Sequence, residues 1–224
     1  MKTLTQVAAS ISSAAPPDFR LEGEGAPQDK ASLLDFWSWA FGDLCDDDVK
    51  GIFAEWMVAR LLDLPAPRRI SWANNDLVTR SGIGIEVKAS AYWQSWKRIN
   101  QNGELKVDAE DVDHAKAKIR FGGLRARDSV SPALQTGGTR GLKSQLYVFC
   151  FQKHWRAAGW DAWQLDQWDF YVLDREQLER EGVGNSISLA KLKRLCGAMT
   201  AAEFKVHMQA RETALPPRSA NTAS

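Results

Sequence analysis

The chain has 224 residues, of which 44% are hydrophobic, and this suits one globular α/β domain with a sizeable core. No run of about 18 apolar residues occurs, which excludes a membrane-spanning helix, and the interrupted apolar stretch near the N-terminus makes a poor signal peptide. The three cysteines are odd in number and widely spaced, which argues against a zinc site or a disulfide framework and favours a cytoplasmic location.

The net charge is +1, but the charge is unevenly distributed along the chain. Residues 1–63 have a balance of −6, whereas residues 64–160 have a balance of +8. Residues 116–156 hold 9 basic residues against one acidic residue. This excess predicts contacts with a phosphate backbone, and the alternative is a solvated basic face.

Residues 1–30 are rich in Ala, Ser, Pro and Gly and predict a flexible N-terminal arm, while residues 216–224 predict a disordered tail. A single domain is expected over residues 31–215. It begins with a short amphipathic helix over residues 32–42, which ends at Gly42.

A second helix is predicted over residues 49–64, ahead of Pro65. The three acids Asp46 to Asp48 are interpreted as caps of this helix rather than as a metal cluster. Glu55 falls on a stripe that is otherwise apolar, so its carboxylate needs a partner. A metal ion, Lys88 or an arginine would each serve. The stripe consists of Ile52, Glu55, Ala59 and Leu62.

Strands are predicted over residues 69–78, 82–89 and 104–108. Along residues 82–89, apolar and polar side chains alternate. The apolar face holds Ile83, Ile85 and Val87, and the opposite face holds Glu86 and Lys88. Burial of the apolar face would therefore hold an acid and a base rigidly side by side.

The segment 119–143 is rich in glycine and basic residues, has no apolar period, and is predicted to be a long flexible loop. A recognition loop and an inert surface excursion both fit this composition. The predicted nucleic-acid-binding residues are Arg120, Arg125, Arg127, Arg140 and Lys143.

Two continuous apolar runs, residues 146–151 and 168–173, predict strands buried on both faces. Asp174, Ser188 and Thr200 are each placed to begin a following helix, Thr200 through a capping box with Glu203. The ten tryptophans are interpreted mainly as core residues, with some available to stack on bases.

Asn75-Asp76 followed after nine residues by Glu86-Val87-Lys88 resembles the PD-(D/E)xK nuclease superfamily. The resemblance covers about residues 48–98. It implies the restriction-endonuclease-like fold, a central mixed β-sheet flanked by helices. The catalytic residues that match the family are Glu55, Asp76, Glu86 and Lys88. The usual proline before the aspartate is replaced by Asn75, and the family implies an assisting polar residue beyond the lysine, for which Ser90 and Gln94 are candidates.

If Asp76 and Glu86 converge, their oxygens would bind Mg²⁺, with Mn²⁺ able to substitute and the Val87 carbonyl as a third ligand. Glu55 would hold a second ion or its water shell. Lys88 would orient or deprotonate the attacking water, or stabilise the negative charge that develops on the phosphate. The resemblance implies products with a 5′-phosphate and a 3′-hydroxyl.

The sequence therefore predicts a Mg²⁺-dependent endodeoxyribonuclease that acts on DNA in restriction, in another phage-defence system with partner proteins, or in repair. A homodimer is expected because a double-strand break needs two metal sites. The alternative is a catalytically inactive DNA-binding or assembly module on the same fold, and a third interpretation is RNA cleavage.

Overall fold

The computed structural model describes residues 24, 32–65, 69, 73–94, 111–126 and 140–214. The chain divides into two units, Met1–Asp43 and Leu44–Ser224. In the first unit, helix α2 (Leu33–Phe41) begins at a capping box in which Ser32 and Asp35 bond each other's backbone amides. The predicted tail, and the predicted arm apart from Glu24, lie outside the described residues.

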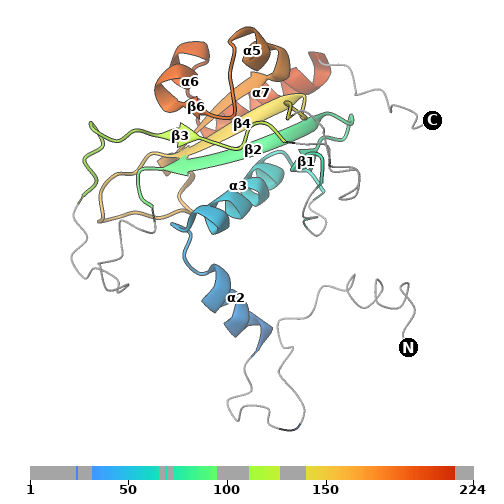
Figure 1. Cartoon of the computed structure of the whole chain (residues 1–224). Helices are drawn as coiled ribbons and strands as arrows, with labels where there is room; N and C mark the ends of the chain where they lie inside the picture. Colours follow the sequence, from blue (N-terminus) through green and yellow to red (C-terminus); the bar gives the residue numbers. More distant parts are fainter. Residues whose placement is uncertain are drawn as a thin grey trace. The chain divides into compact units, whose positions relative to one another are not determined.

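The second unit contains a mixed four-stranded sheet in the order β1-β2-β4-β5 (Figure 1). Its strands are β1 (Leu77–Val78), β2 (Gly84–Ala91), β4 (Leu146–Gln152) and β5 (Trp168–Asp174). Strand β2 runs antiparallel to β1 and parallel to β4, and β4 runs antiparallel to β5. The parallel register places Glu86 beside Tyr147 and Lys88 beside Phe149.

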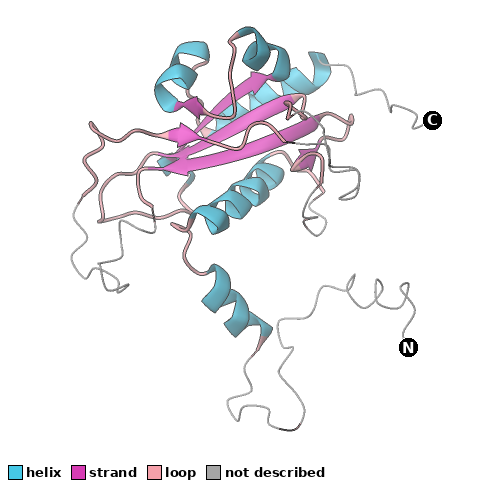
Figure 2. Ribbon diagram, in the orientation of Figure 1, coloured by secondary structure: helices cyan, strands magenta, loops and turns pink. Residues whose placement is uncertain are grey.

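Helices flank this sheet, which confirms the predicted mixed α/β architecture (Figure 2). They are α3 (Asp47–Leu61), α5 (Arg175–Arg180), α6 (Leu189–Leu195) and α7 (Ala201–Ala214), with a short 3-10 helix η2 (Leu165–Gln167) before β5. The three predicted N-terminal caps are confirmed, because the side chains of Asp174, Ser188 and Thr200 each accept a bond from a backbone amide three residues later.

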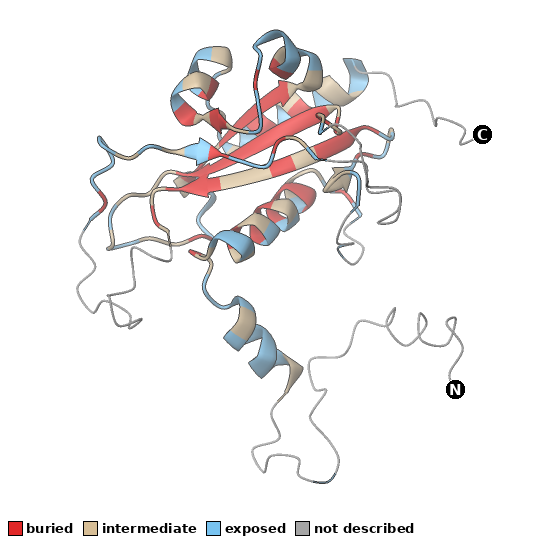
Figure 3. Cartoon of the chain, viewed as in Figure 1, coloured by how far each residue is buried: buried red, intermediate tan, exposed pale blue. Residues whose placement is uncertain are grey.

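Two hydrophobic clusters cover the two faces of the sheet. On one face, Ile85 and Val87 of β2, with Ile83 directly before the strand, pack with residues of α3 and α7. The other face packs against α5, α6 and a second, two-stranded sheet of β3 (Arg120–Phe121) and β6 (Ile187–Ser188). Strand β4 is buried along its whole length (Figure 3), as its continuous apolar sequence predicts.

The structure corrects several predicted boundaries. Within the predicted strand 69–78, the described residues pair only at Leu77 and Val78, because the polar turn before them ends the ladder. The predicted loop 119–143 contains β3, since Phe121 is fully buried, and Ala126 pairs with Gly141 as an isolated bridge. The predicted strand 104–108 lies outside the described residues.

Helix α3 buries only part of the predicted stripe. Ala59 is buried and Leu62 packs against the core, but Ile52 is 37% exposed. Most of the core residues of the helix lie off the stripe, namely Phe53, Ala54, Met57 and Val58. The side chain of Asp46 caps the helix by accepting bonds from the amides of the second and third residues that follow it, so the interpretation of this acid as a cap is confirmed. Among the described residues, no helix has both the length and the apolar character needed to cross a membrane.

Candidate functional site

The Asp76 carboxylate sits where the two-residue strand β1 leaves the edge of β2 unpaired. Strand β1 pairs with β2 only at Leu77 with Ile85 and at Val78 with Gly84. The Val87 amide, further along β2, therefore has no backbone partner in β1. Asp76 Oδ2 accepts the bond from the Val87 amide at 2.8 Å instead. Because the amide and carbonyl of one strand residue point to the same edge, the Val87 carbonyl also points to the side that Asp76 occupies.

Glu86 and Lys88 project together from the polar face of β2, as the alternation predicts. Lys88 Nζ lies 2.6 Å from Glu86 Oε1, and the two side chains are only 22% and 17% exposed. The hydroxyl of Ser144 lies 3.4 Å from Glu86 Oε2 and donates to Asn75 Oδ1 at 2.8 Å. Ser144, two residues before β4, therefore links Glu86 to Asn75.

The pKa of Asp76 responds to burial and to nearby charges. Burial, as the largest cause, and the negative charge of Glu86, as the second, raise the pKa of Asp76 from 3.8 to about 7. The Lys88 ammonium and the Val87 amide oppose this rise, but less strongly. Burial, with the Glu86 charge as a second cause, raises the pKa of Tyr147 to about 12. Asp76, Glu86 and Lys88 thus form one electrostatic group, referred to below as the edge cluster.

Among the described residues, no hydrogen bond or ion pair joins Glu55 to Glu86 or Lys88. The two carboxylate oxygens of Glu55 accept bonds from Arg69 at 2.5 and 2.9 Å. Of the three partners that the sequence suggested for Glu55, the structure therefore shows the arginine. Glu55 raises the pKa of Asp76, but it is the weakest of the causes. The structure therefore brings three of the four predicted catalytic residues together, and Glu55 approaches only Asp76.

A groove of about 660 Å³ adjoins the edge cluster. Its walls include Glu55, Arg69, Asn75 and Asp76, but neither Glu86 nor Lys88. Asp76 is consequently the member shared by the edge cluster and the groove. A ligand in the groove would lie within reach of Asp76.

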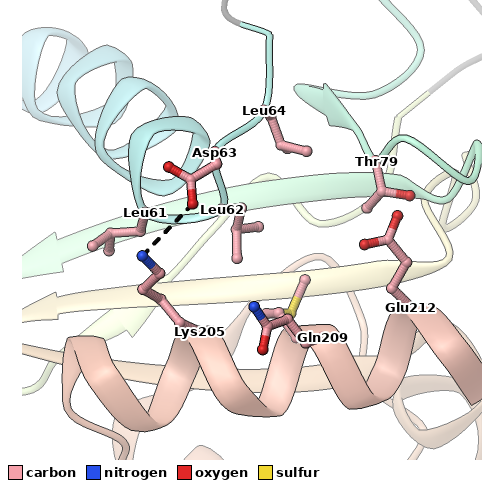
Figure 4. Close-up of a pocket in the computed structure, with 9 residues that line it drawn as sticks. Leu61, Leu62, Asp63, Leu64, Thr79, Lys205, Gln209 and Glu212 are labelled. Atoms are coloured by element: carbon pink, nitrogen blue, oxygen red, sulfur yellow. Dashed lines mark ion pairs between the residues drawn. The ribbon is translucent and has the colours of Figure 1, made fainter.

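A second, smaller cavity has a structural role. It occupies about 40 Å³ between the end of α3 and α7 (Figure 4), room for no more than a few water molecules. Asp63 at its rim lies 3.7 Å from Lys205 Nζ. Glu212 accepts bonds from the amide and the hydroxyl of Ser81. These contacts tie α7 to the β1–β2 connection.

The donor atoms of the edge cluster suit a hard divalent cation. Two carboxylates and a backbone carbonyl offer oxygen ligands of the kind that Mg²⁺ prefers. A cation between Asp76 and Glu86 would also relieve the repulsion that raises the pKa of Asp76. No group of three or more His, Cys, Asp or Glu side chains is gathered at metal-binding distance within the described residues. Glu86 and Glu55 are instead each bonded to a cationic side chain.

The two predicted assisting residues differ in placement. Gln94 Oε1 accepts a bond from the buried Lys50 ammonium at 2.8 Å, and its amide nitrogen donates to the Ala91 carbonyl. Gln94 therefore contacts the N-terminal part of α3 rather than the edge cluster. Ser90 is buried on β2, two residues beyond Lys88 on the same face of the strand.

The predicted nucleic-acid-binding residues lie partly on the β3–β6 layer, which covers the sheet face from which Glu86 and Lys88 project. Arg120 is exposed and donates to Ser186 Oγ. The Arg125 guanidinium donates twice to the Val183 carbonyl, so it is committed to a structural contact. Arg140 is exposed, the Lys143 amide donates to Tyr147 Oη, and Arg127 lies outside the described residues.

Sequence reasoning missed several residues around the site. Arg69 and Ser144 carry no local pattern that would single them out. Trp56 offered a weak signal, because it lies four residues after Ile52 and so on the same side of α3. It is 45% exposed and lines the groove together with Arg60.

Comparison of the chain with models of protein families, with curated proteins and with solved structures finds no match in any of the three. The contacts described above therefore carry the functional argument.

Proposed function

We propose that this chain is a Mg²⁺-dependent endodeoxyribonuclease of the restriction-endonuclease-like type. The main supporting observation is that Asp76 lies close to Glu86 and Lys88. The Asp76 carboxylate accepts a bond from the amide of Val87, which stands between Glu86 and Lys88 in β2. A paired carboxylate site with an ammonium group alongside fits metal-assisted cleavage of a phosphodiester.

The order of elements supports the same fold proposal. Helix α3 carries an acid, Asp76 precedes the short strand β1, and β2 carries Glu-x-Lys. This is the order in which the PD-(D/E)xK superfamily arranges its site. Restriction or another phage-defence system remains the proposed setting, with a homodimer supplying two sites for a double-strand break.

In the proposed mechanism, Asp76, Glu86 and the Val87 carbonyl would hold the metal ion, which would acidify a bound water and offset negative charge on the scissile phosphate. Lys88 fixes the rotamer of Glu86 through their 2.6 Å contact. An ammonium group has three N–H donors, so Lys88 could also orient the attacking water or donate to a phosphate oxygen in the transition state.

Asp76 also makes the site sensitive to pH. Its pKa of about 7 means that a large fraction of the carboxyl groups is protonated at neutral pH. Binding of a cation requires the carboxylate, so ion uptake must release this proton. Cleavage is therefore expected to rise with pH through about 7 at limiting Mg²⁺.

A catalytically inactive DNA-binding module is the second candidate. The observation in its favour is that Glu55 and Glu86 each already have a cationic partner. Such ion pairs are also found as purely structural features of proteins. RNA cleavage is distinguished from DNA cleavage by exchanging the substrate in the same assay.

The deciding experiment incubates supercoiled plasmid with the protein in Mg²⁺ and, separately, in EDTA. We expect nicking in Mg²⁺ only, and its loss in Glu86→Ala and Lys88→Ala. The matched control is Lys153→Ala, because Lys153, directly after β4, forms an ion pair of 2.7 Å with Asp169 of β5. Nicking that persists in both site variants would refute the proposal, and binding without cutting would support the inactive module.

A further inference from the structure

The groove beside Asp76 has an aromatic wall that the proposed chemistry does not use. Trp56 and Ile52 of α3 contribute to this wall, and both are partly exposed. Trp56 is held in place by ring contacts with Phe53 at 5.8 Å and with Trp163 at 5.7 Å. An exposed indole that is already fixed by its neighbours offers a preformed surface for stacking, at little further cost in side-chain entropy.

Trp163 extends this aromatic surface. It lies in the connection before η2, is 63% exposed, and packs edge-on against Phe53 with ring centroids 5.1 Å apart. The cluster is thus anchored in the core through Phe53, while its two tryptophans face solvent. Exposed aromatic residues gathered in this way are typical of binding surfaces.

The charged residues of the groove complement an anion. Among the residues that the structure describes, three arginines line it against two carboxylates. Arg69 is bonded to Glu55, and Arg80, which donates to the Asp63 carbonyl, also interacts electrostatically with Glu212. Arg60 has no carboxylate within ion-pair distance among the described residues and is exposed. The unpaired charge beside the aromatic wall is therefore the positive charge of Arg60, while Asp76 places a carboxyl group at the end of the groove that adjoins the edge cluster.

We propose that this groove seats an unpaired nucleotide of the nucleic-acid substrate, with its base on Trp56 and its phosphate toward Arg60. The inference rests on the proposed function and deepens it, since it names single-stranded or locally unpaired DNA as the substrate class. A volume of about 660 Å³ lies within the range of small-ligand sites, and an aromatic surface beside cationic groups is how single strands are bound without sequence preference. A seated nucleotide would place the adjoining phosphodiester near Asp76.

The test measures binding by fluorescence anisotropy in EDTA, where no cleavage occurs. The probe is a labelled oligothymidylate of about twelve nucleotides, within the site size of known single-strand binders, and a blunt duplex is the second probe. Trp56→Ala is expected to weaken single-strand binding about 10-fold, the effect of losing one stacked base. Trp56→Phe is expected to retain most of the affinity, because it keeps a π-face and the core contacts.

Two further variants sharpen the assignment. Val206→Ala shortens an apolar side chain of α7 that is 68% exposed and does not line the groove, and the affinity of this variant for the single strand is expected to be unchanged. Arg60→Gln is expected to lower the slope of log affinity against log salt by about 0.7, the value for one phosphate contact on a single strand. Thermal melting of each variant confirms that it is folded.

The outcomes separate this inference from the proposed function. If Trp56→Ala binds the oligothymidylate like the wild type, or if Val206→Ala loses as much affinity as Trp56→Ala, the groove assignment is overturned while plasmid nicking can stand. If the duplex loses as much affinity as the single strand, the preference for unpaired nucleotides is overturned. If the wild type nicks no plasmid but Trp56→Ala selectively loses single-strand binding, the nuclease proposal fails and the groove assignment holds. The same probe made of RNA tests whether the groove discriminates the sugar.

Discussion

Replacing Asp76 by asparagine should make the protein more stable while abolishing its proposed activity. Asp76 has a pKa of about 7 in the folded chain, against 3.8 as its ordinary value. The folded state therefore binds more protons than the unfolded state between these two values, and the free energy of unfolding falls as the pH rises through this window. Asparagine does not titrate, so the free energy of unfolding of Asp76→Asn should not fall in this way as the pH rises.

The size of the effect follows from the same shift. At 1.36 kcal/mol per pH unit, the full difference corresponds to about 4 kcal/mol above pH 7. The Asp76 side chain is only partly buried, and solvent screening reduces this to roughly 2 kcal/mol. For a chain of this length, about 2 kcal/mol raises the melting temperature by roughly 4–8 °C. Asparagine Oδ1 can still accept the Val87 amide bond, so no hydrogen bond needs to be lost.

The assay is urea unfolding in EDTA at about pH 4.5 and about pH 8, on either side of most of the window. We expect the wild type to lose about 2 kcal/mol relative to Asp76→Asn between these conditions. Asp166→Asn, at an exposed carboxyl of η2, is the control and should track the wild type. An Asp76→Asn variant that is less stable than the wild type at the higher pH, or that keeps the wild-type pH dependence, would refute this reasoning.

Three other substitutions test how the fold supports the site. In Gly84→Ala, the new Cβ would lie 2.3 Å from Asn75 Oδ1, so the Asn75 side chain beside Asp76 must move; we expect about 1 kcal/mol lower stability in urea and slower plasmid nicking, and unchanged nicking would show that the placement of Asn75 is dispensable. Asp46→Ala removes the cap of α3 and should cost about 1 kcal/mol in thermal melting, whereas no loss would show that the two capping bonds are unimportant. Phe149→Ala opens a cavity beside Phe121 and should cost about 3–5 kcal/mol, with Phe149→Leu costing much less; equal losses would indicate that packing volume is not the cause.

The elements that the sequence predicted best are those with local signals. The cap at Asp174 is a local interaction, and its helix begins as expected. The apolar runs at 146–151 and 168–173 appear as buried strands because their side chains have no polar face to expose. Strand order and direction were beyond sequence reasoning, since the parallel pairing of β2 with β4 depends on the whole intervening chain.

Shorter elements and the partners of the site residues escaped prediction. A two-residue strand such as β3 has no period to detect, and it forms because Phe121 fits the core. The alternation along β2 placed Glu86 and Lys88 on one face, but nothing local indicated that Arg69 would bind Glu55. The face that α3 buries was predicted only in part, with Ala59 buried and Ile52 exposed, because the helix carries apolar residues on more than one side, including the partly exposed Trp56.

The central claim is that Asp76 and Glu86 share one divalent cation beside Lys88. Isothermal titration calorimetry of Mg²⁺ into the protein bound to a non-cleavable DNA tests it directly. The proposal predicts uptake of one ion per chain by the wild type, accompanied by proton release near neutral pH, and loss of this uptake in both Asp76→Asn and Glu86→Gln. Undiminished uptake in these two variants, or no uptake by the wild type in the presence of nucleic acid, would contradict it.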